Sequence, residues 1–308
     1  MSAGSSRVGS LVAAVKARWN AGIPPHSFAL LRIALGLMGL LSLVALTPVE
    51  MFWPLDGLTP LSADGTGPRA WLLAHGFGTV AGWALFLALT VVFAALTVGW
   101  WSDAAVLGAF VGLIAQDHWN NIPLSSAHRV LIVTIFCLLW AETGRVWSLD
   151  AFLSGRAHDP DARVPPWPLW LMRCQVAVIY GSTGLHKLAY PVWRDGSGVH
   201  WALNLNVFHR LPWAVPPEAA TLVALATWAT LAFELLFPIL VMVRRLRPWV
   251  LIAGVGLHLG LWATLELGPF SWIMLATYIA FLDPDTTSRL FRRDGKSGLG
   301  AAARPSTT

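Results

Sequence analysis

Long apolar stretches recur along the whole chain, and they constrain its fold more than any other feature. A helix of about 20 residues crosses the roughly 30 Å hydrocarbon core of a bilayer, and most of these stretches are close to that length, although the last is short. Only 12% of the residues are charged, whereas a typical soluble domain has about 25%. We therefore predict an all-α, polytopic membrane helix bundle of about eight transmembrane helices. The predicted spans are Phe28 to Thr47, Gly78 to Val98, Ala104 to Asn121, His128 to Trp147, Pro168 to Leu188, Ala219 to Val243, Trp249 to Leu265 and Pro269 to Leu282.

The Lys and Arg residues between these spans predict the orientation of the chain. With the N-terminus in the cytoplasm, the outer side receives few basic residues, namely Arg69, Arg129, Lys187, Arg194 and Arg210. Arg32 and Arg173 fall within spans, and all other Lys and Arg fall on the cytoplasmic side. Positive charge accumulates on the cytoplasmic side of membrane proteins. We therefore expect both termini in the cytoplasm of a multi-pass protein of the cell membrane, in this case a bacterial inner membrane.

The same pattern divides the chain into three segments. Residues 1–27 form a basic cytoplasmic N-terminus, residues 28–285 the transmembrane domain, and residues 286–308 a basic cytoplasmic tail that we expect to be disordered. The first segment has no short apolar core followed by a small-residue cleavage site, so we expect no removable signal peptide. The first span is then its own insertion signal.

Composition and motifs exclude several function classes. The net charge of +5 does not indicate a nucleic-acid partner, because the basic residues lie between apolar spans as topology signals. Cys137 and Cys174 lie in separate spans, which argues against a disulfide framework and against a CxxC redox pair. The HExxH pattern, the phosphate loop and the GxSxG elbow are absent. We expect no metal ion, and the partner that composition does predict is the lipid bilayer.

Ionisable residues inside apolar spans are candidate sites, because each costs about 2.5 kcal/mol or more there unless it is paired or hydrated. The predicted topology turns the polar ends of the third, fifth and seventh spans toward the outer side. We therefore expect a site in the outer half of the bilayer. The candidates are Arg32, Asp117, His118, Glu142, Arg173, His186, Lys187, Glu234, His258 and Glu266.

Lys187 has two interpretations. It follows the small residues Gly181 to Gly184, which permit close helix approach. A lysine held in an apolar environment gives up its charge more readily and can serve as a base near neutral pH. Alternatively, Lys187 extends to the outer interface as a helix-end anchor. Spacing alone favours the interpretation of Lys187 as a helix-end anchor, but it does not exclude a role as a base.

Other polar residues also have a structural alternative. Glu234 lies in the middle of a span and needs a partner, for which Arg32 and Arg173 are the candidates; the pairing would be structural or part of substrate handling. His258, between two glycines, is by itself more often a hydrogen-bonded packing residue than a ligand or proton carrier. The polar group from Asp117 to Asn121 is typical of a capped helix C-terminus before a turn.

Several segments resemble, in order, those of one known family. They are Arg32-Ile33 with Gly36; Trp119-Asn120-Asn121; Trp147-Ser148-Leu149-Asp150; Leu171-Met172-Arg173-Cys174-Gln175; Gly184-Leu185-His186-Lys187-Leu188; Trp193-Arg194-Asp195-Gly196; and His258 with Gly268 to Ala276. Together they resemble the membrane region of the vitamin K-dependent gamma-glutamyl carboxylase. The chain is thus similar to the horizontally transferred transmembrane domain (HTTM) family, to which that region belongs.

The resemblance implies a catalytic lysine, which falls on Lys187, and a functional histidine at His258. In the carboxylase the lysine deprotonates reduced vitamin K, oxygen converts it to an epoxide, and the strong base so produced removes a proton from a glutamate before carbon dioxide adds. The implied cofactors are therefore a reduced quinone, either vitamin K or menaquinol, with oxygen and carbon dioxide.

Three departures weaken the transfer of that activity. His186 stands at the first position of the family's Lys-Lys pair, and Ile122 stands where the carboxylase has a histidine after Trp-Asn-Asn. The carboxylase also has a large β-rich extracytoplasmic region that helps to hold its peptide, whereas few residues follow Asp283 here. We therefore do not expect glutamate carboxylation itself to carry over unchanged.

The leading hypothesis is a membrane protein that modifies or matures a peptide or a lipid at the outer face, with a quinol-type cofactor and a lysine base. A non-catalytic binding, immunity or peptide-maturation partner is the alternative, and a transporter is the second alternative. The predicted catalytic residues are Lys187 and His258. The predicted pocket residues are Asp117, His118, Asn120, Asn121, His186, Glu234 and Trp193, and the predicted structural charges are Arg32 and Arg173.

Overall fold

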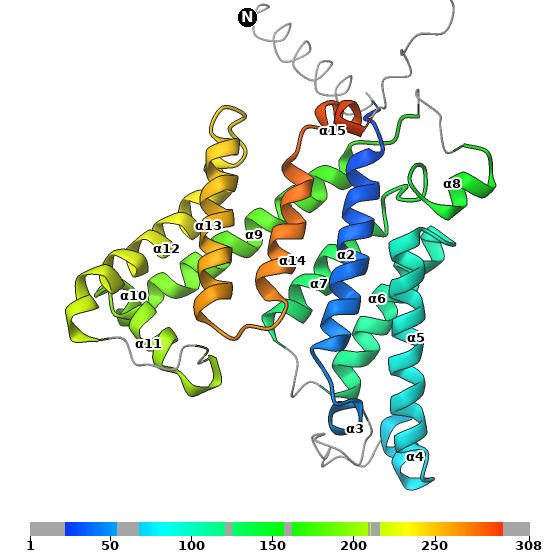
Figure 1. Ribbon diagram of the computed structural model, residues 1–308, viewed down its shortest axis with the longest axis horizontal. Helices are drawn as coiled ribbons and strands as arrows, with labels where there is room; N and C mark the ends of the chain where they lie inside the picture. Colours follow the sequence, from blue (N-terminus) through cyan, green and yellow to red (C-terminus); the bar gives the residue numbers. More distant parts are fainter. Residues whose placement is uncertain are drawn as a thin grey trace, which may run out of the picture.

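The computed structural model describes residues 22–53, 68–120, 125–156, 162–208, 210 and 216–291. Within these residues the regular structure is helical, apart from one isolated β-bridge between Ile23 and Val164, which confirms the predicted all-α class. The long helices lie side by side as a bundle (Figure 1). The elements are α2 (His26–Val44), α3 (Val49–Phe52), α4 (Pro68–Ala74), α5 (Gly78–Val98), α6 (Ser102–Trp119), α7 (Ser126–Leu138), α8 (Leu149–Leu153), α9 (Trp167–Ala189), α10 (Pro191–Arg194), α11 (Gly198–Asn204), η1 (Asn206–Phe208), η2 (Pro217–Ala219), α12 (Ala220–Leu240), α13 (Arg247–Thr264), α14 (Phe270–Thr277), η3 (Tyr278–Phe281) and α15 (Pro284–Phe291).

Every predicted apolar segment contains a helix, and α5 has the predicted bounds. The largest difference is in the fourth segment, where α7 ends at Leu138 and not at Trp147. Turns follow Leu138, and Trp147 has a left-handed backbone with a φ of 52°. A helix cannot continue through that conformation. The apolar run therefore overstated the length of this helix.

In the described part of the chain, three helices are long and apolar enough to cross a membrane: α2, α5 and the continuous helix Pro217–Leu240 that joins η2 to α12. α6, α9 and α13 have similar lengths, but they carry most of the ionisable residues that the sequence singled out. Many large apolar side chains on the bundle surface are exposed, among them Val80, Leu222 and Ile239. Such a surface suits contact with lipid, and the protein is a membrane protein.

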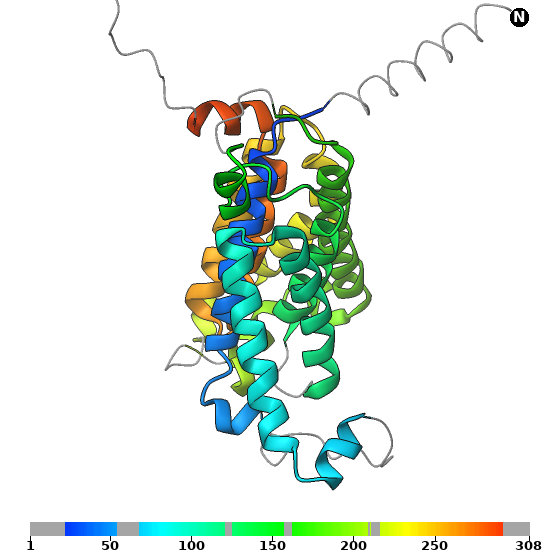
Figure 2. The ribbon, with the colours of Figure 1, turned by 90° about the vertical axis from the view of Figure 1, so that its right-hand side faces the viewer.

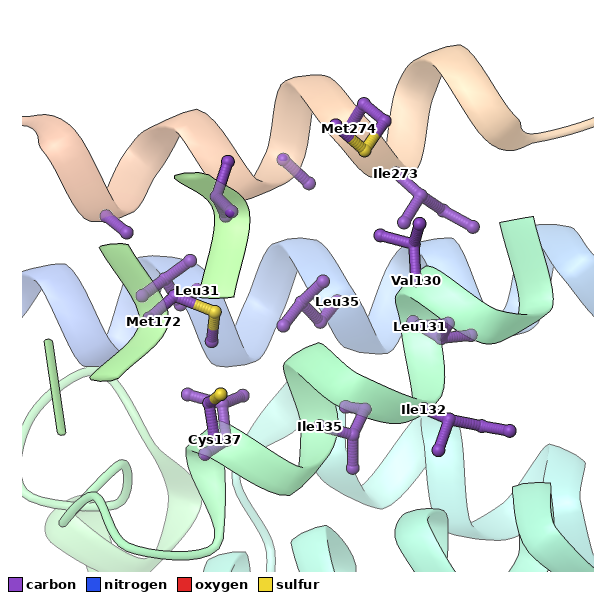
Figure 3. Packing of buried hydrophobic residues seen from close by; sticks show 14 of the residues in the cluster. Leu31, Leu35, Val130, Leu131, Ile132, Ile135, Cys137, Met172, Ile273 and Met274 are labelled. Atoms are coloured by element: carbon purple, nitrogen blue, oxygen red, sulfur yellow. The ribbon is translucent and has the colours of Figure 1, made fainter. Parts of the chain in front are cut away.

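α2 lies at the centre of the apolar core. Its Leu31 and Leu35 are completely buried in a cluster that includes Ile135 of α7, Met172 of α9 and Ile273 of α14 (Figure 3). α2 also packs along α5 and against α15. One helix thus joins the elements of both halves of the chain.

The two ends of the bundle differ. α15 lies across one end beside the beginning of α2, whereas α3 and α4 lie at the opposite end (Figure 2). The described chain therefore begins and finishes at the same end of the bundle. We refer to this end as the α15 end.

Two charged residues organise the α15 end. Arg32 is completely buried; its Nη1 donates to the Leu96 and Thr97 carbonyls (2.9 and 3.2 Å), and its Nη2 donates to the Trp147 carbonyl (2.5 Å). Asp150 accepts hydrogen bonds from the backbone N–H groups of Trp101 (2.8 Å) and Ser102 (2.7 Å). Because these are unpaired donors at the start of α6, Asp150 caps that helix from a distant part of the chain.

The capping interaction also affects the acidity of Asp150. Burial alone would raise the pKa of this carboxyl. The hydrogen bonds from Ser102 and Trp101 and the charge of Arg32 together lower the pKa by more than burial raises it, so the pKa lies below its ordinary value. A carboxyl with a lowered pKa in the folded protein stabilises the fold above its unfolded pKa of about 3.9. This contribution disappears as the pH falls through the folded pKa.

α9 and α12 approach each other closely. A Cβ atom built on Gly184 of α9 would lie 3.0 Å from the Leu235 nitrogen and 3.1 Å from the Glu234 carbonyl carbon of α12. Gly181, one turn earlier, faces Pro238 in the same way. The small residues of α9 therefore permit the close helix approach that the sequence predicted.

We predict that Asp150→Asn lowers the stability of the protein at pH 7 by about 1.5–3 kcal/mol, because the amide NH₂ cannot accept one of the two backbone hydrogen bonds that Asp150 receives and a hydrogen bond to a charged group contributes about that much. The measurement is thermal unfolding of the purified protein in detergent. The difference from wild type should shrink as the pH is lowered toward 3, because wild-type Asp150 is then protonated. Asp103→Asn is the control, since Asp103 lies in the first turn of the same helix and has no hydrogen bond of this kind among the described residues. An equal loss in both variants would contradict the cap.

We predict that Gly184→Leu separates α9 from α12 and costs about 1–3 kcal/mol, the usual cost of overpacking. Gly256→Leu on α13 is the matched control, because a Cβ at Gly256 meets no atom within 4 Å. Thermal unfolding in detergent compares the two. Equal stability of both variants would show that the α9–α12 contact tolerates a side chain at Gly184.

Candidate functional site

A cavity of about 560 Å³ lies between α7, α9, α11, α12, α13 and α14. Most of its wall is apolar, and this volume is within the 300–1,000 Å³ that small-molecule sites occupy. It contains residues that are far apart in the sequence. The polar and aromatic residues in its wall are Ser126, Arg129, Gln175, Tyr180, Ser182, Thr183, Lys187, Trp193, Phe208, Thr230, Glu234, His258, Thr264 and Phe270.

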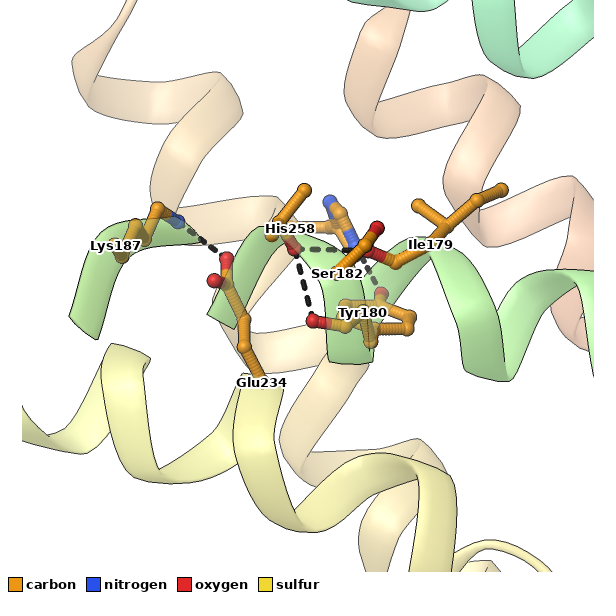
Figure 4. Close-up of polar contacts among 7 residues, drawn as sticks. Ile179, Tyr180, Ser182, Lys187, Glu234 and His258 are labelled. Atoms are coloured by element: carbon orange, nitrogen blue, oxygen red, sulfur yellow. Dashed lines mark hydrogen bonds and ion pairs between the residues drawn. The ribbon is translucent and has the colours of Figure 1, made fainter. Parts of the chain in front are cut away.

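Lys187 and Glu234 form an ion pair across the cavity wall, from Lys187 Nζ to Glu234 Oε1 (Figure 4). Their side chains are 25% and 10% exposed. The Lys187 ammonium also lies 4.6 Å from the ring centroid of Trp193, within the range of a cation–π interaction. Each charge is therefore compensated inside an apolar region, and removing one partner of such a pair typically costs about 3–5 kcal/mol.

The ion pair corrects the predicted partner of Glu234. Neither Arg32 nor Arg173 pairs with it. Close packing of α9 on α12 brings Lys187 beside Glu234, whereas both arginines bind backbone carbonyls elsewhere. Arg173 Nε donates to the Ala280 carbonyl (2.6 Å), and Arg173 also lies over the Trp170 ring at 5.1 Å.

A buried hydrogen-bond network adjoins the ion pair. The Tyr180 hydroxyl lies 2.5 Å from His258 Nε2 and 2.6 Å from the Tyr278 hydroxyl (Figure 4). All three side chains are buried, and His258 is 2% exposed. Gly254 leaves the space that the Tyr278 hydroxyl occupies, since a Cβ there would lie 2.0 Å from it. The network fixes the orientation of the His258 ring.

Sequence reasoning assigned no role to Tyr180 or Tyr278. The chain has only three tyrosines, and a buried tyrosine needs a hydrogen-bond partner where a phenylalanine does not. A tyrosine inside an apolar span therefore indicates a buried hydrogen bond, and this signal could have been used to predict the network. Pairing Tyr180 with Tyr278 also requires knowing that α9 meets η3, which spacing along the chain does not reveal.

The predicted pocket residues of α6 lie outside this cavity. Asp117 accepts a hydrogen bond from Arg129 Nη1 at 2.8 Å, and Arg129 is the member of this pair that lines the cavity. His118 Nδ1 lies 2.9 Å from the Ile114 carbonyl of its own helix. Asn120 Nδ2 donates to the Phe52 carbonyl at 2.9 Å and holds α3 against α6. Asn121 lies outside the described residues.

His186 and Lys187 are adjacent but have different surroundings. His186 is exposed and forms an edge-to-face contact with Tyr190, with ring centroids 5.1 Å apart. It does not line the cavity, whereas Lys187 does. Successive residues of a helix point about 100° apart, so one of the two faces away from α12. Four of the predicted residues, Lys187, His258, Glu234 and Trp193, therefore meet at one cavity.

The side chains of the cavity suit an amphiphilic ligand. An apolar wall favours a ring and a hydrocarbon chain, and the polar residues offer hydrogen bonds to hydroxyl or carbonyl oxygens. In the described part of the chain, no group of three His, Cys, Asp or Glu side chains could hold a metal ion. Cys137 is buried and Cys174 is exposed, and both are free thiols.

Comparison with known proteins agrees with the sequence motifs. The HTTM domain matches residues 20–286, which is most of the chain. No solved structure matches it. The resemblance to the carboxylase membrane region is consistent with this match. The chain therefore belongs to the HTTM domain family.

Proposed function

We propose that this membrane protein binds a reduced quinone in the Lys187 cavity and uses the Lys187–Glu234 pair as proton acceptor to modify a peptide or lipid at the outer membrane face. One observation carries the proposal. A half-buried lysine, its buried carboxylate partner, an aromatic ring over the lysine and a fixed histidine all meet at one apolar cavity. Ionisable groups that converge in an apolar pocket are candidates for a functional site.

The proposal includes eight transmembrane spans with both termini in the cytoplasm. Support comes from the helices in all eight apolar segments, from the basic residues on one side of the chain, and from the shared end at which the described chain begins and finishes. In this orientation the α15 end faces the cytoplasm. Lys187, near the C-terminal end of α9, then lies toward the outer side.

The proposed chemistry of the pair follows from its surroundings. Lys187 and Glu234 can exist as ammonium and carboxylate, or as amine and carboxylic acid after the proton moves along their hydrogen bond. An apolar cavity favours the neutral form more than water does, because buried charges lose their hydration. In the neutral form the Lys187 amine can accept a proton from a hydroxyl group in the cavity.

The other cavity residues would position the reactants. The Trp193 ring covers the Lys187 ammonium and limits its motion. Tyr180 holds His258 at a fixed angle in the cavity wall. A bound reduced quinone would supply two electrons and, with oxygen, the strong base that a carboxylase-like reaction needs; carbon dioxide is the added group if that reaction is a carboxylation.

A second function fits the same cavity, namely binding of a peptide or of a neighbouring membrane protein without chemistry, as in an immunity or maturation partner. The ion pair favours it, because a lysine paired with a carboxylate is held as a cation and is then a poor base. Transport has less support. Glu234 is engaged with Lys187, and Arg32 and Arg173 bind backbone carbonyls.

We predict that Lys187→Arg abolishes oxygen-dependent consumption of reduced menaquinone or vitamin K by the purified protein, by at least about 100-fold. Arginine keeps the positive charge beside Glu234, so the fold is retained. Because arginine does not lose its proton, it cannot serve as the base. Lys187→Ala should show the same loss with lower stability, because Glu234 is left unpaired.

His186→Ala is the matched control, since His186 is the neighbouring residue and faces away from the cavity. It should consume quinol at the wild-type rate. If folded wild-type protein consumes no quinol, the catalytic proposal is rejected and binding without chemistry remains as the proposed function. Wild-type activity of folded Lys187→Arg would remove Lys187 as the base.

We predict that Tyr180→Phe reduces stability by about 1–3 kcal/mol, because it leaves His258 Nε2 and the Tyr278 hydroxyl without their shared partner. Tyr278→Phe should cost less, since the Tyr180–His258 hydrogen bond remains. Quinol consumption should fall in the same order, with His258→Ala the lowest of the three. Thermal unfolding and quinol oxidation test this order, and a larger effect of Tyr278→Phe than of Tyr180→Phe would contradict it.

A further inference from the structure

The segment that joins α12 to α13, residues 241–246, carries a concentration of arginines at the α15 end of the bundle (Figure 1). It begins where the apolar helix Pro217–Leu240 ends, and a helix that crosses the bilayer places the residues after it at the level of the lipid headgroups. Arg244 and Arg245 are exposed in this segment, and Arg247 follows as the first residue of α13. We refer to Arg244, Arg245 and Arg247 as the arginine cluster.

The arginine cluster has little compensating negative charge. Asp283 is the acidic residue that pairs with it in the described part of the chain, and this contact is long, at 3.9 Å from Asp283 Oδ1 to Arg244 Nη2. The other carboxylate oxygen, Oδ2, accepts hydrogen bonds from the Thr286 backbone N–H (3.2 Å) and hydroxyl (2.9 Å) at the start of α15. The Arg244 side chain remains 83% exposed. One carboxylate, already engaged in capping a helix, therefore serves the whole cluster.

A fourth arginine lies close to the cluster. Arg173 of α9 is near enough to Arg247 for their charges to repel, and Arg247 is repelled by Arg244 in the same way. Arg173 donates hydrogen bonds to the carbonyls of Ala280 and Leu282. A carbonyl accepts a hydrogen bond but does not neutralise the charge of its donor. An anion at this site would relieve the repulsion.

Exposed apolar side chains accompany the arginines. Val243 is 44% exposed, Leu246 is 42% exposed and Trp249 is 71% exposed. Tryptophan is enriched where the bilayer meets water, and the guanidinium fork of arginine matches the geometry of a phosphate. A soluble anion would use the charges alone. A phospholipid would use both features, because its phosphate and its acyl chains belong to one molecule.

A second group of arginines at the same end lacks this excess of positive charge. Arg145 Nε lies 2.7 Å from Glu142 Oε2. Both line a surface pocket with Arg156, Asp103 and Asp150, so the carboxylates outnumber the arginines among the described residues of that pocket. An anion would therefore be drawn to the arginine cluster and not to Arg145.

We propose that the arginine cluster binds the headgroup phosphate of an anionic phospholipid, such as phosphatidylglycerol, whose acyl chains lie along Leu246 and Trp249. Basic groups at a membrane surface attract anionic headgroups, and each arginine contributes about fivefold in affinity. The partner is thus a component of the leaflet at the α15 end. This inference goes beyond the proposed function, since it does not involve the Lys187 cavity.

The test measures lipid preference and needs neither quinol nor turnover. The full chain is placed in nanodiscs of phosphatidylglycerol and phosphatidylcholine in equal parts with the same acyl chains, and native mass spectrometry identifies the lipids that the protein retains. We expect wild type to retain phosphatidylglycerol preferentially. The preference should fall about fivefold in Arg245→Gln and about 25-fold in the double variant Arg244→Gln/Arg245→Gln. Arg145→Gln is the matched control and should keep the wild-type preference, because Arg145 is already paired.

Asp283→Asn tests the inference in the opposite direction. Asparagine also caps helices, so α15 is retained while the competing carboxylate is removed. The preference for phosphatidylglycerol should rise, by about two- to fivefold. Arg244→Lys/Arg245→Lys keeps both charges and should keep most of the preference. Thermal unfolding in detergent establishes that each variant is folded.

Equal retention of the two lipids by wild type would overturn the inference. An unchanged preference in the folded Arg244→Gln/Arg245→Gln variant would also overturn it and leave these arginines as topology signals. Inorganic phosphate, added at constant ionic strength, should not displace phosphatidylglycerol; displacement would reject a lipid site in favour of a soluble anion. Quinol consumption, measured separately, should be unchanged in these variants, because none of the substituted residues lines the Lys187 cavity. Failure of either proposal therefore leaves the other standing.

Discussion

Inside a bilayer there is no water to satisfy polar groups, so each must find a partner within the protein. This constraint explains the long-range polar contacts between the helices. Arg32 and Arg173 reach backbone carbonyls of other segments. Lys187 finds Glu234, and Tyr180 links His258 to Tyr278. Apolar packing around α2 holds the helices together, and the polar contacts determine which faces meet.

The length of the apolar stretches was sufficient to locate the long helices, whereas the short helices between them were not predicted. The boundary of α7 was wrong because Leu139, Trp140 and Ala141 are still apolar although the helix has ended. Trp147 has a left-handed backbone, and its carbonyl accepts a hydrogen bond from Arg32, which is 115 positions away in the sequence. A pattern read along the chain could not reveal it.

The candidate site was predictable to a similar degree. Lys187 and His258 were identified from their residue types in apolar spans and from the family motifs, and both line one cavity. The partner of Glu234 was not predictable, because any buried cation would satisfy it and only helix packing selects Lys187. Asp117 and His118 were grouped with the site because the predicted topology puts them on the same side of the bilayer. Asp117 binds Arg129 and His118 lies against the Ile114 carbonyl of its own helix, and spacing in sequence does not reveal these partners.

The Lys187 cavity adjoins a second cavity, because both are lined by Phe270. The first is largely apolar and holds a buried ion pair, which suits a lipid-soluble reactant. The second lies at the ends of α2 and α6, and its polar lining includes Gln116, His128 and Glu266. Phe270 stands between them and touches His258.

The three carbonyl contacts of Arg32 have a mechanical consequence. They tie α2 to the end of α5 and to the segment before α8, and Asp150 ties that segment to α6. Opening this end would strand a buried guanidinium in hydrocarbon, so it behaves as a fixed pivot. The contacts of Arg32 and Asp150 therefore resist separation of α2, α5, α6 and α8 at this end of the bundle.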